Sequence, residues 1–192
     1  MSQRRAIIIG LGIPVGFLVA ILIWGTLQTG GEQGRPGVNI DFGDVPVSTD
    51  PRSDFVLPLL DGGEISLGDL RGKVVVVDFW ASWCPPCRAE GPILAEAYLD
   101  WRDRGVEFVG IALWDVDDST REFVIANAIE YPVGIDERGR IGVDFGVKAL
   151  PEKFFVMPDG EIVKKVVGPS SRSQLDAILT ELTDRAIGID RS

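Results

Sequence analysis

Apolar and polar positions divide the chain into a long uncharged segment, a polar stretch and a region of short alternating elements. Residues 6–27 carry no charged side chain, and about 22 residues of helix span about 33 Å, enough for the hydrocarbon core of a membrane. The pattern predicts a transmembrane helix here, with a buried core helix as the alternative. Residues 28–51 are rich in Gly, Pro, Asp and Ser, and are predicted to form a flexible linker.

The charges around the apolar segment predict its orientation. Arg4 and Arg5 precede it, and positive charges favour the cytoplasmic side, so residues 1–5 are expected in the cytoplasm and the domain outside, in the periplasm. The segment is longer than the apolar region of a cleavable signal, and no small-residue cleavage motif follows it. We therefore expect a retained signal anchor in the cell membrane, with a cleaved signal as the alternative.

Residues 52–187 have the pattern of one α/β domain, followed by a tail over 188–192. Asp61-Gly62-Gly63 separates two short apolar pieces and predicts a hairpin. Residues 73–80 are apolar on both faces except at Lys73 and Asp78, which is typical of a central strand covered on both sides. A helix is predicted over 85–104, with a kink at Gly91-Pro92.

The second half of the domain alternates strands and helices. A strand is predicted over 106–113, and Ser119 is expected to begin the next helix. Strands at 153–157 and 161–167 flank the turn Pro158-Asp159-Gly160. A last helix is predicted through Leu175, Ile178 and Leu182. This order predicts an α/β sandwich around one sheet, and the late hairpin makes that sheet mixed.

Composition excludes several classes of function. The formal net charge is -10, which disfavours contact with the phosphates of nucleic acid. The chain has no histidine, so His-ligated zinc, a Ser-His-Asp triad and a Cys-His nucleophile are excluded. The two cysteines cannot complete the four-ligand shell of structural zinc, so neither a metal nor another cofactor is predicted. Redox chemistry is the natural use of the cysteine pair.

The motif Trp83-Cys84-Pro85-Pro86-Cys87 lies between the predicted central strand and a helix. A helix N-terminus favours a thiolate, so Cys84 is predicted to be exposed there and to act as the nucleophile. Cys87 lies three residues later, close enough to resolve a mixed disulfide. The alternative is a chance spacing or an inert structural disulfide, although structural disulfides usually join distant elements.

These residues resemble the thioredoxin superfamily, most closely its anchored branch of TlpA, ResA and CcmG/DsbE-like cytochrome c maturation proteins. The resemblance covers roughly residues 51–185. It depends on the segments VVVVDFWASWCPPCRAE, YPVGIDERGRIGVDFGVKALPEKFFV and PDGEIVKKVVG, together with Pro92. It implies a thioredoxin-like three-layer sandwich, in which residues 114–144 contain the extra strand and helix of this branch.

The resemblance also implies roles for individual residues. Pro151 corresponds to a cis-proline that faces the cysteine pair, and Leu150 offers backbone groups to a substrate peptide; the alternative is an ordinary trans proline. Trp83 and Pro86 are supporting residues of the motif. Glu90 corresponds to the active-site glutamate of the branch, with a solvated helix residue as the alternative.

Two more carboxylates are candidate functional residues. Asp78 interrupts an apolar strand, where an ionised carboxylate is costly. Plain thioredoxin carries aspartate there, whereas the anchored branch often carries asparagine. Asp78 is therefore a candidate proton acceptor for Cys87, with a structural hydrogen bond as the alternative. Glu152 follows Pro151, as in cytochrome maturation members, and its role stays open.

The function expected from these features is thiol:disulfide oxidoreduction outside the cytoplasm, as a reductant of protein disulfides such as those of apocytochrome c. The family resemblance suggests that substrate, and a transmembrane thiol carrier would have to supply the electrons. Prolines at 85 and 86 and the nearby carboxylates disfavour a thiolate, which favours a reducing role. The alternatives are a general periplasmic disulfide oxidoreductase, a peroxiredoxin-like antioxidant and a redox-inactive binding module. The peroxidatic Thr-x-x-Cys motif of peroxiredoxins is absent around Cys84, which disfavours the second.

Overall fold

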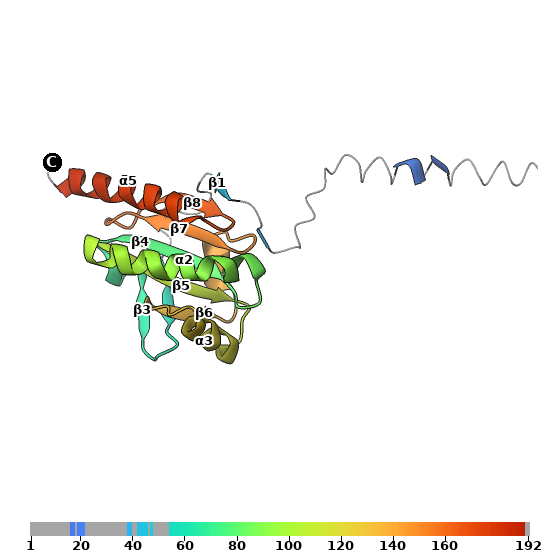
Figure 1. Ribbon diagram of the computed structural model, residues 1–192, viewed down its shortest axis with the longest axis horizontal. Coiled ribbons are helices and arrows are strands. Elements are labelled where there is room, and N and C mark those ends of the chain that lie inside the picture. The colour runs from blue at the N-terminus through green and yellow to red at the C-terminus, as the bar shows by residue number, and fades with distance from the viewer. Residues whose placement is uncertain are drawn as a thin grey trace, which may run out of the picture. The chain divides into compact units, whose positions relative to one another are not determined.

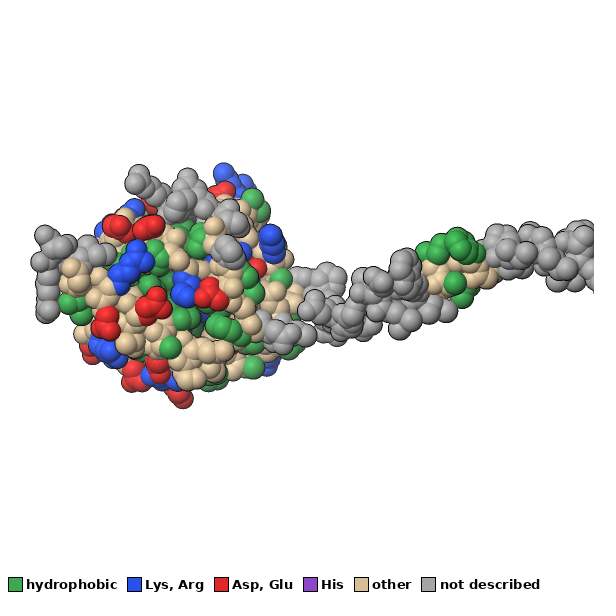
Figure 2. Space-filling view, turned by 90° about the horizontal axis from the view of Figure 1, so that it is seen from above, with side chains coloured by type: hydrophobic (Ala, Val, Ile, Leu, Met, Phe, Trp, Pro, Cys, Tyr) green, Lys and Arg blue, Asp and Glu red, His purple; other side chains and the backbone are tan. Residues whose placement is uncertain are grey.

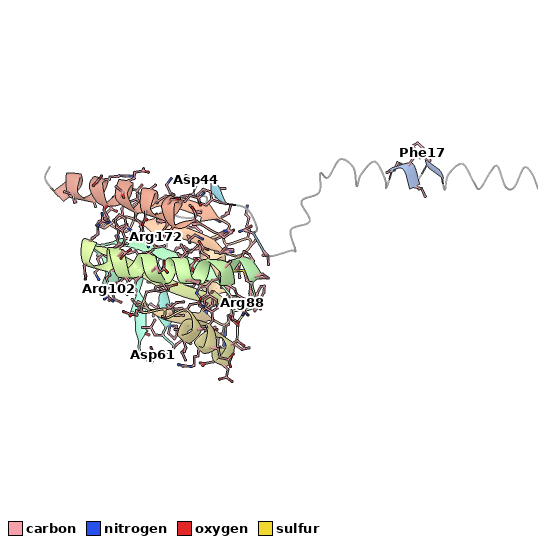
Figure 3. The ribbon with its side chains drawn as sticks, in the orientation of Figure 1. Phe17, Asp44, Asp61, Arg88, Arg102 and Arg172 are labelled. Carbon is pink, nitrogen blue, oxygen red and sulfur yellow. A yellow bond between two sulfur atoms is a disulfide. The ribbon has the colours of Figure 1, made fainter. Side chains whose placement is uncertain are left out.

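The computed structural model describes residues 16–17, 19–21, 38–39, 42–45, 47 and 54–190, with side chains through residue 188. The chain forms two compact units, residues 1–34 and residues 35–192. The described residues of the first unit are helical and exposed, and Figure 3 labels Phe17 among them. Most of the predicted anchor at 6–27 lies outside the described residues. Among those that are described, no helix is long and apolar enough to cross a membrane.

A six-stranded mixed sheet organises the second unit (Figure 1). Its strand order across the sheet is β1 (Gly43–Val45), β8 (Ile162–Val167), β7 (Glu152–Val156), β4 (Val74–Trp80), β5 (Val106–Leu113) and β6 (Val133–Asp136). The β4–β5 and β5–β6 pairs are parallel and the other pairs are antiparallel, which confirms the predicted mixed sheet. β1 falls inside the range predicted to be a linker, and it forms the outer edge of the sheet next to β8.

Consecutive residues of β4 contact opposite layers of the domain. Phe79 packs against Phe145, with ring centroids 5.3 Å apart, whereas Trp80 packs against Phe123 at 4.3 Å. Side chains alternate across a strand, so Phe145 and Phe123 cover different faces. All seven residues of β4 are buried, as predicted for a central strand.

The layers on the two faces have different helices. α2 (Pro85–Trp101), α3 (Asp117–Ala126) and α5 (Arg172–Asp190) cover the face of Trp80, and α4 (Arg140–Asp144) covers the other. Figure 1 shows α2 and α5 lying side by side across the sheet. The Trp101 indole donates to Asp176 Oδ1 at 2.8 Å, and the Arg172 guanidinium, labelled in Figure 3, reaches Asp100 at 2.6 Å. These contacts join the two helices and complete the predicted three-layer sandwich.

The predicted hairpin is present as β2 (Val56–Pro58) and β3 (Glu64–Ser66), followed by the short helix η1 (Leu67–Leu70). Its turn contains Gly62 and Gly63 at φ 92° and 77°, values that favour glycine. The hairpin packs on β6 without space for a side chain, because a Cβ on Gly134 would lie 2.2 Å from the Pro58 carbonyl oxygen. A glycine at 134 is therefore needed for this contact.

Some element boundaries differ from the predictions. α3 begins at Asp117 rather than Ser119, and the acidic side chains of Asp117 and Asp118 complement the positive end of the helix dipole in its first turn. The helix predicted over 85–104 ends as α2 at Trp101 and continues as η2 (Arg102–Arg104). α5 extends to Asp190, beyond the predicted domain end at 187.

Charged side chains of both signs are interspersed over the described face in Figure 2. Several form exposed ion pairs, such as Arg102–Glu130 at 2.7 Å. An exposed pair contributes about 0–1 kcal/mol to stability. The buried apolar residues between the sheet and its helices therefore dominate the stability of the domain.

Candidate active site

The cysteine pair lies at the first turn of α2. Cys84 is the N-cap residue of this helix and forms a disulfide with Cys87, with the two Cα atoms 5.3 Å apart. Pro85 and Pro86 occupy the first two helical positions and have no N–H. The amide of Cys87 is therefore the first backbone donor of the helix, and it donates to Cys84 Sγ at 3.4 Å.

Both cysteines are buried in this oxidised form: Cys84 is 0% exposed and Cys87 is 3% exposed. The prediction of an exposed Cys84 is wrong for this state. The disulfide turns the Cys84 side chain back over the end of α2, where its sulfur accepts the Cys87 amide. Trp83, the preceding residue, is 47% exposed and marks the surface beside the pair.

The loop between β4 and α2 is fastened to the loop that follows β5. The backbone amide and hydroxyl of Ser82 both donate to Asp115, at 2.6 and 2.8 Å. The Trp83 indole donates to the carbonyl oxygen of Trp114 at 3.1 Å. Trp114 itself adopts φ 52°, a conformation that non-glycine residues rarely take. The segment after β5 thus positions the active-site loop.

A buried cluster of charges lies under α2. Glu90, on α2, is 1% exposed, and Lys153, on β7, is 0% exposed. The Lys153 ammonium lies 2.7 Å from Glu90 Oε1 and 2.9 Å from Oε2, and it also donates to the Gly168 carbonyl oxygen at 3.0 Å. Glu90 Oε1 additionally accepts the Ser170 amide at 2.7 Å. The alternative of a solvated Glu90 is therefore wrong.

Asp78 is the second buried carboxyl of this cluster, at 2% exposure. It lies opposite Lys153 in the β4–β7 register. Its Oδ1 has no hydrogen-bond partner among the described residues, so this oxygen does not make the structural hydrogen bond considered as an alternative. Burial raises the pKa of Asp78 to about 7, while Lys153 lowers the pKa and Glu90 raises it. Asp78 is thus a carboxyl that can exchange a proton near neutral pH.

The geometry of α2 places Cys87 next to this cluster. Cys87 and Glu90 are three residues apart, so they lie on the same face of the helix, and both are buried. Glu90 interacts electrostatically with Asp78 and is paired with Lys153. Cys87 therefore lies one helical turn from a group of two carboxyls and one ammonium.

The Leu150–Pro151 peptide is cis, as the resemblance implies. Glu152 supports the loop before it, because its Oε1 accepts the amides of Lys148 and Ala149 at 3.2 and 3.3 Å. Glu152 also pairs with the buried Lys165 at 2.7 Å. Its role, which the sequence left open, is to hold the cis-proline loop.

Three contributors to the site were not predicted: Lys153, Asp115 and Asn39. Lys153 could have been predicted from the sequence, because buried charges usually occur in pairs and Asp78 already interrupts a neighbouring apolar strand. Asp115 could not have been, since it lies in an acidic loop. Asn39 donates to carbonyl groups of the cis-proline loop from within the predicted linker, where composition indicates no fixed structure.

This fold and site define a thioredoxin-like thiol:disulfide oxidoreductase, with a disulfide at the start of α2 and a cis-proline before β7. The chain belongs to the AhpC/TSA family, whose model matches residues 49–165. Thiol-disulfide oxidoreductase ResA of Bacillus thuringiensis (strain Al Hakam) is 35% identical over 130 residues, which cover 68% of this chain and 75% of that protein. ResA of Bacillus subtilis (strain 168) is 29% identical over 177 residues, covering 91% of this chain and 92% of that protein.

A solved structure has the same fold. It is a secreted Mycobacterium tuberculosis disulfide oxidoreductase, described as homologous to E. coli DsbE, with a TM-score of 0.61 and 28% identity. The similarity covers 67% of this chain and 96% of that one. The chain is therefore a thiol-disulfide oxidoreductase of the ResA/DsbE type, which confirms the predicted thioredoxin-like fold of the domain and the enzyme class.

Proposed function

We propose that this enzyme reduces protein disulfides outside the cytoplasm, with the haem-binding cysteines of apocytochrome c as its substrate class. Residues 6–27 anchor it in the cell membrane, residues 1–5 remain in the cytoplasm, and residues 28–51 connect the anchor to the domain. The uncharged segment and the two arginines before it support this topology. The secreted relative supports a location outside the cytoplasm.

The chemistry is an exchange of one disulfide for another. The Cys84 thiolate attacks a sulfur of the substrate disulfide and forms a mixed disulfide, while the other substrate sulfur leaves as a thiolate. Cys87 then loses its proton to Asp78 and attacks Cys84 Sγ. The substrate leaves as a dithiol, and the enzyme is left with the Cys84–Cys87 disulfide. Backbone groups of Leu150 hold the substrate chain during both steps.

The first turn of α2 is the observation that supports a reducing role for the enzyme. A thiolate at Cys84 can accept the amide of Cys87, but Pro85 and Pro86 offer none. The carboxyls of Asp78 and Glu90 place negative charge nearby, offset by one lysine. A weakly stabilised thiolate favours the disulfide form of the enzyme, so the dithiol form is a good electron donor.

The reduction potential tests this direction. Residues 35–192 form a compact unit and can be equilibrated with thiol–disulfide buffers, and the oxidised fraction read from Trp fluorescence. We expect a potential near the thioredoxin value of about −270 mV, whereas a value near the DsbA potential of about −120 mV would contradict the proposal. Trapping with Cys87→Ser in cells would identify the partner, and recovery of an apocytochrome c would support the substrate class.

A further inference from the structure

The side chain of Lys153 is buried and carries a charge. Its ammonium has three acceptors at 2.7–3.0 Å, the two Glu90 oxygens and the Gly168 carbonyl, and it is 0% exposed. An unpaired ammonium is costly to bury, so these acceptors fix the position of the charge. The β4–β7 register places this fixed charge opposite Asp78.

The groups around Asp78 come from every element packed against it. β7 contributes Lys153 and α2 contributes Glu90, with Cys87 one helical turn before Glu90 on the same face of α2. The segment before β6 contributes the buried Tyr131, whose pKa is raised well above its usual value by burial and by both carboxylates. β5 contributes Gly110, which has no side chain. Among the described residues that act on Asp78, Lys153 supplies the positive charge.

We propose that Lys153 is a positioning residue for proton transfer at Cys87. Its ammonium offsets the charge of Glu90, and Asp78 thereby remains able to release and accept a proton under the conditions in which the enzyme works. This proposal rests on the proton-acceptor role proposed for Asp78. It adds Lys153, from β7, to the two carboxyls of Asp78 and Glu90.

A double-mutant cycle tests the proposal. The rate at which Cys87 resolves a mixed disulfide is measured against pH by stopped-flow Trp fluorescence in wild type, Lys153→Met, Glu90→Gln and the double variant. Lys153→Met should move the midpoint of the profile up by about 1 pH unit or more, and Glu90→Gln should move it down. The double variant should fall between wild type and Lys153→Met, because the effect of Lys153 on Asp78 exceeds that of Glu90.

The double variant also controls for folding, since it removes both charges of the ion pair and leaves neither Lys153 nor Glu90 as a buried ion without its counter-charge. Equal midpoints in all four proteins would overturn the role of Lys153. Asp78→Asn separates this failure from that of the underlying role. If Asp78→Asn abolishes the pH dependence while Lys153→Met leaves it unchanged, only the role of Lys153 is refuted; if Asp78→Asn has no effect, the role of Asp78 is refuted as well.

Asn39 makes three hydrogen bonds with the cis-proline loop. Its backbone amide donates to the Leu150 carbonyl oxygen at 2.5 Å, and its side-chain amide donates to the carbonyls of Ala149 and Pro151 at 3.1 and 3.2 Å. Val38 forms a parallel bridge with Leu150. One residue thus binds three consecutive carbonyl groups.

We infer that Val38 and Asn39 occupy the backbone edge at Leu150 that an extended substrate segment uses, so that the chain competes with its own substrate. The inference rests on the substrate-binding role proposed for Leu150. The burial of Leu150 also supports it: this residue is 0% exposed, so a substrate backbone must displace something to reach it. The segment that competes with substrate is therefore residues 38–39 of the same chain.

Kinetics with two disulfides of different size test this inference in the full chain. Asn39→Ala removes both hydrogen bonds of the side-chain amide and should raise the second-order rate of reduction of a protein disulfide, such as that of insulin, by about fivefold or more. The rate with a small aromatic disulfide should not change, because that substrate has no backbone to pair. Thr180→Ala removes a side-chain hydrogen bond on α5 and should change neither rate.

An unchanged or reduced rate with the protein disulfide in Asn39→Ala would overturn the inference. A wild-type enzyme that reduces the small disulfide but no protein disulfide would instead refute the proposed function. The two failures are therefore distinguishable.

Discussion

Replacing Asp78 by Asn should stabilise the oxidised protein at about pH 8 and leave its stability at about pH 4 nearly unchanged. The carboxyl is 2% exposed, its Oδ1 has no partner among the described residues, and burial raises its pKa from 3.8 to about 7. That rise corresponds to a free-energy cost of about 4 kcal/mol for the ionised carboxyl in the folded state. Asparagine has nearly the same shape and no charge, so it avoids this cost.

The sign of this stability difference follows from the number of protons that the folded and unfolded states bind at Asp78. Between about pH 4 and pH 7 the folded state holds a proton on Asp78 that the unfolded state has released, so the free energy of unfolding falls as the pH rises through this window. Below it both states are neutral at this residue, and above it the folded state carries the full cost. The difference between Asp78→Asn and wild type should therefore grow from near zero to at most about 4 kcal/mol.

Guanidinium unfolding of the oxidised proteins at several pH values measures this difference. Circular dichroism and Trp fluorescence should give coincident transitions, which justifies a two-state free energy. Asp103→Asn, which changes an exposed carboxyl, is the matched control and should show no such growth. A difference that is the same at all pH values, or a loss of stability in Asp78→Asn at high pH, would refute the assignment of Asp78 as a buried carboxyl that takes up a proton near neutral pH.

Four other changes have defined outcomes. On non-reducing gels, Cys87→Ser should accumulate mixed disulfides with substrate and Cys84→Ser should form none; equal capture by both would contradict the assigned roles. Gly134→Ala should cost about 1–3 kcal/mol in denaturant unfolding, because its Cβ would meet the Pro58 carbonyl oxygen, whereas Gly188→Ala has open space and should be tolerated. Glu90→Gln should cost about 3–5 kcal/mol by leaving Lys153 without its counter-charge, and unchanged stability would mean that the pair contributes little. Protease added to spheroplasts should release the domain while the N-terminus stays protected; a domain protected until lysis would refute the proposed orientation.

The parts of the fold that were predicted have a strong local pattern. β4 is apolar on both faces, the β2–β3 turn contains two glycines, and the cysteine motif lies between a strand and a helix. The cis peptide at Pro151 came only from the resemblance, because few X-Pro bonds are cis and no local pattern requires it.

The parts that were missed depend on contacts between distant residues. Lys153 finds its partner 63 residues away, and the sequence does not show which buried charges meet. β1 and Asn39 are held through backbone groups and a side-chain amide, which leave no hydrophobic periodicity to detect. The burial of Cys84 was also missed, since it depends on how the disulfide folds over the end of α2.

Catalysed reduction of insulin tests the central claim most directly, because it requires the cysteine pair to exchange a disulfide with a protein. Residues 35–192, supplied with dithiothreitol, should accelerate the precipitation of insulin chains well above the rate with dithiothreitol alone. Cys84→Ser should reduce that rate to the background, and Ser192→Ala should leave it unchanged. A wild-type domain that holds a reduced pair yet shows no turnover, or a Cys84→Ser variant as active as wild type, would contradict the account.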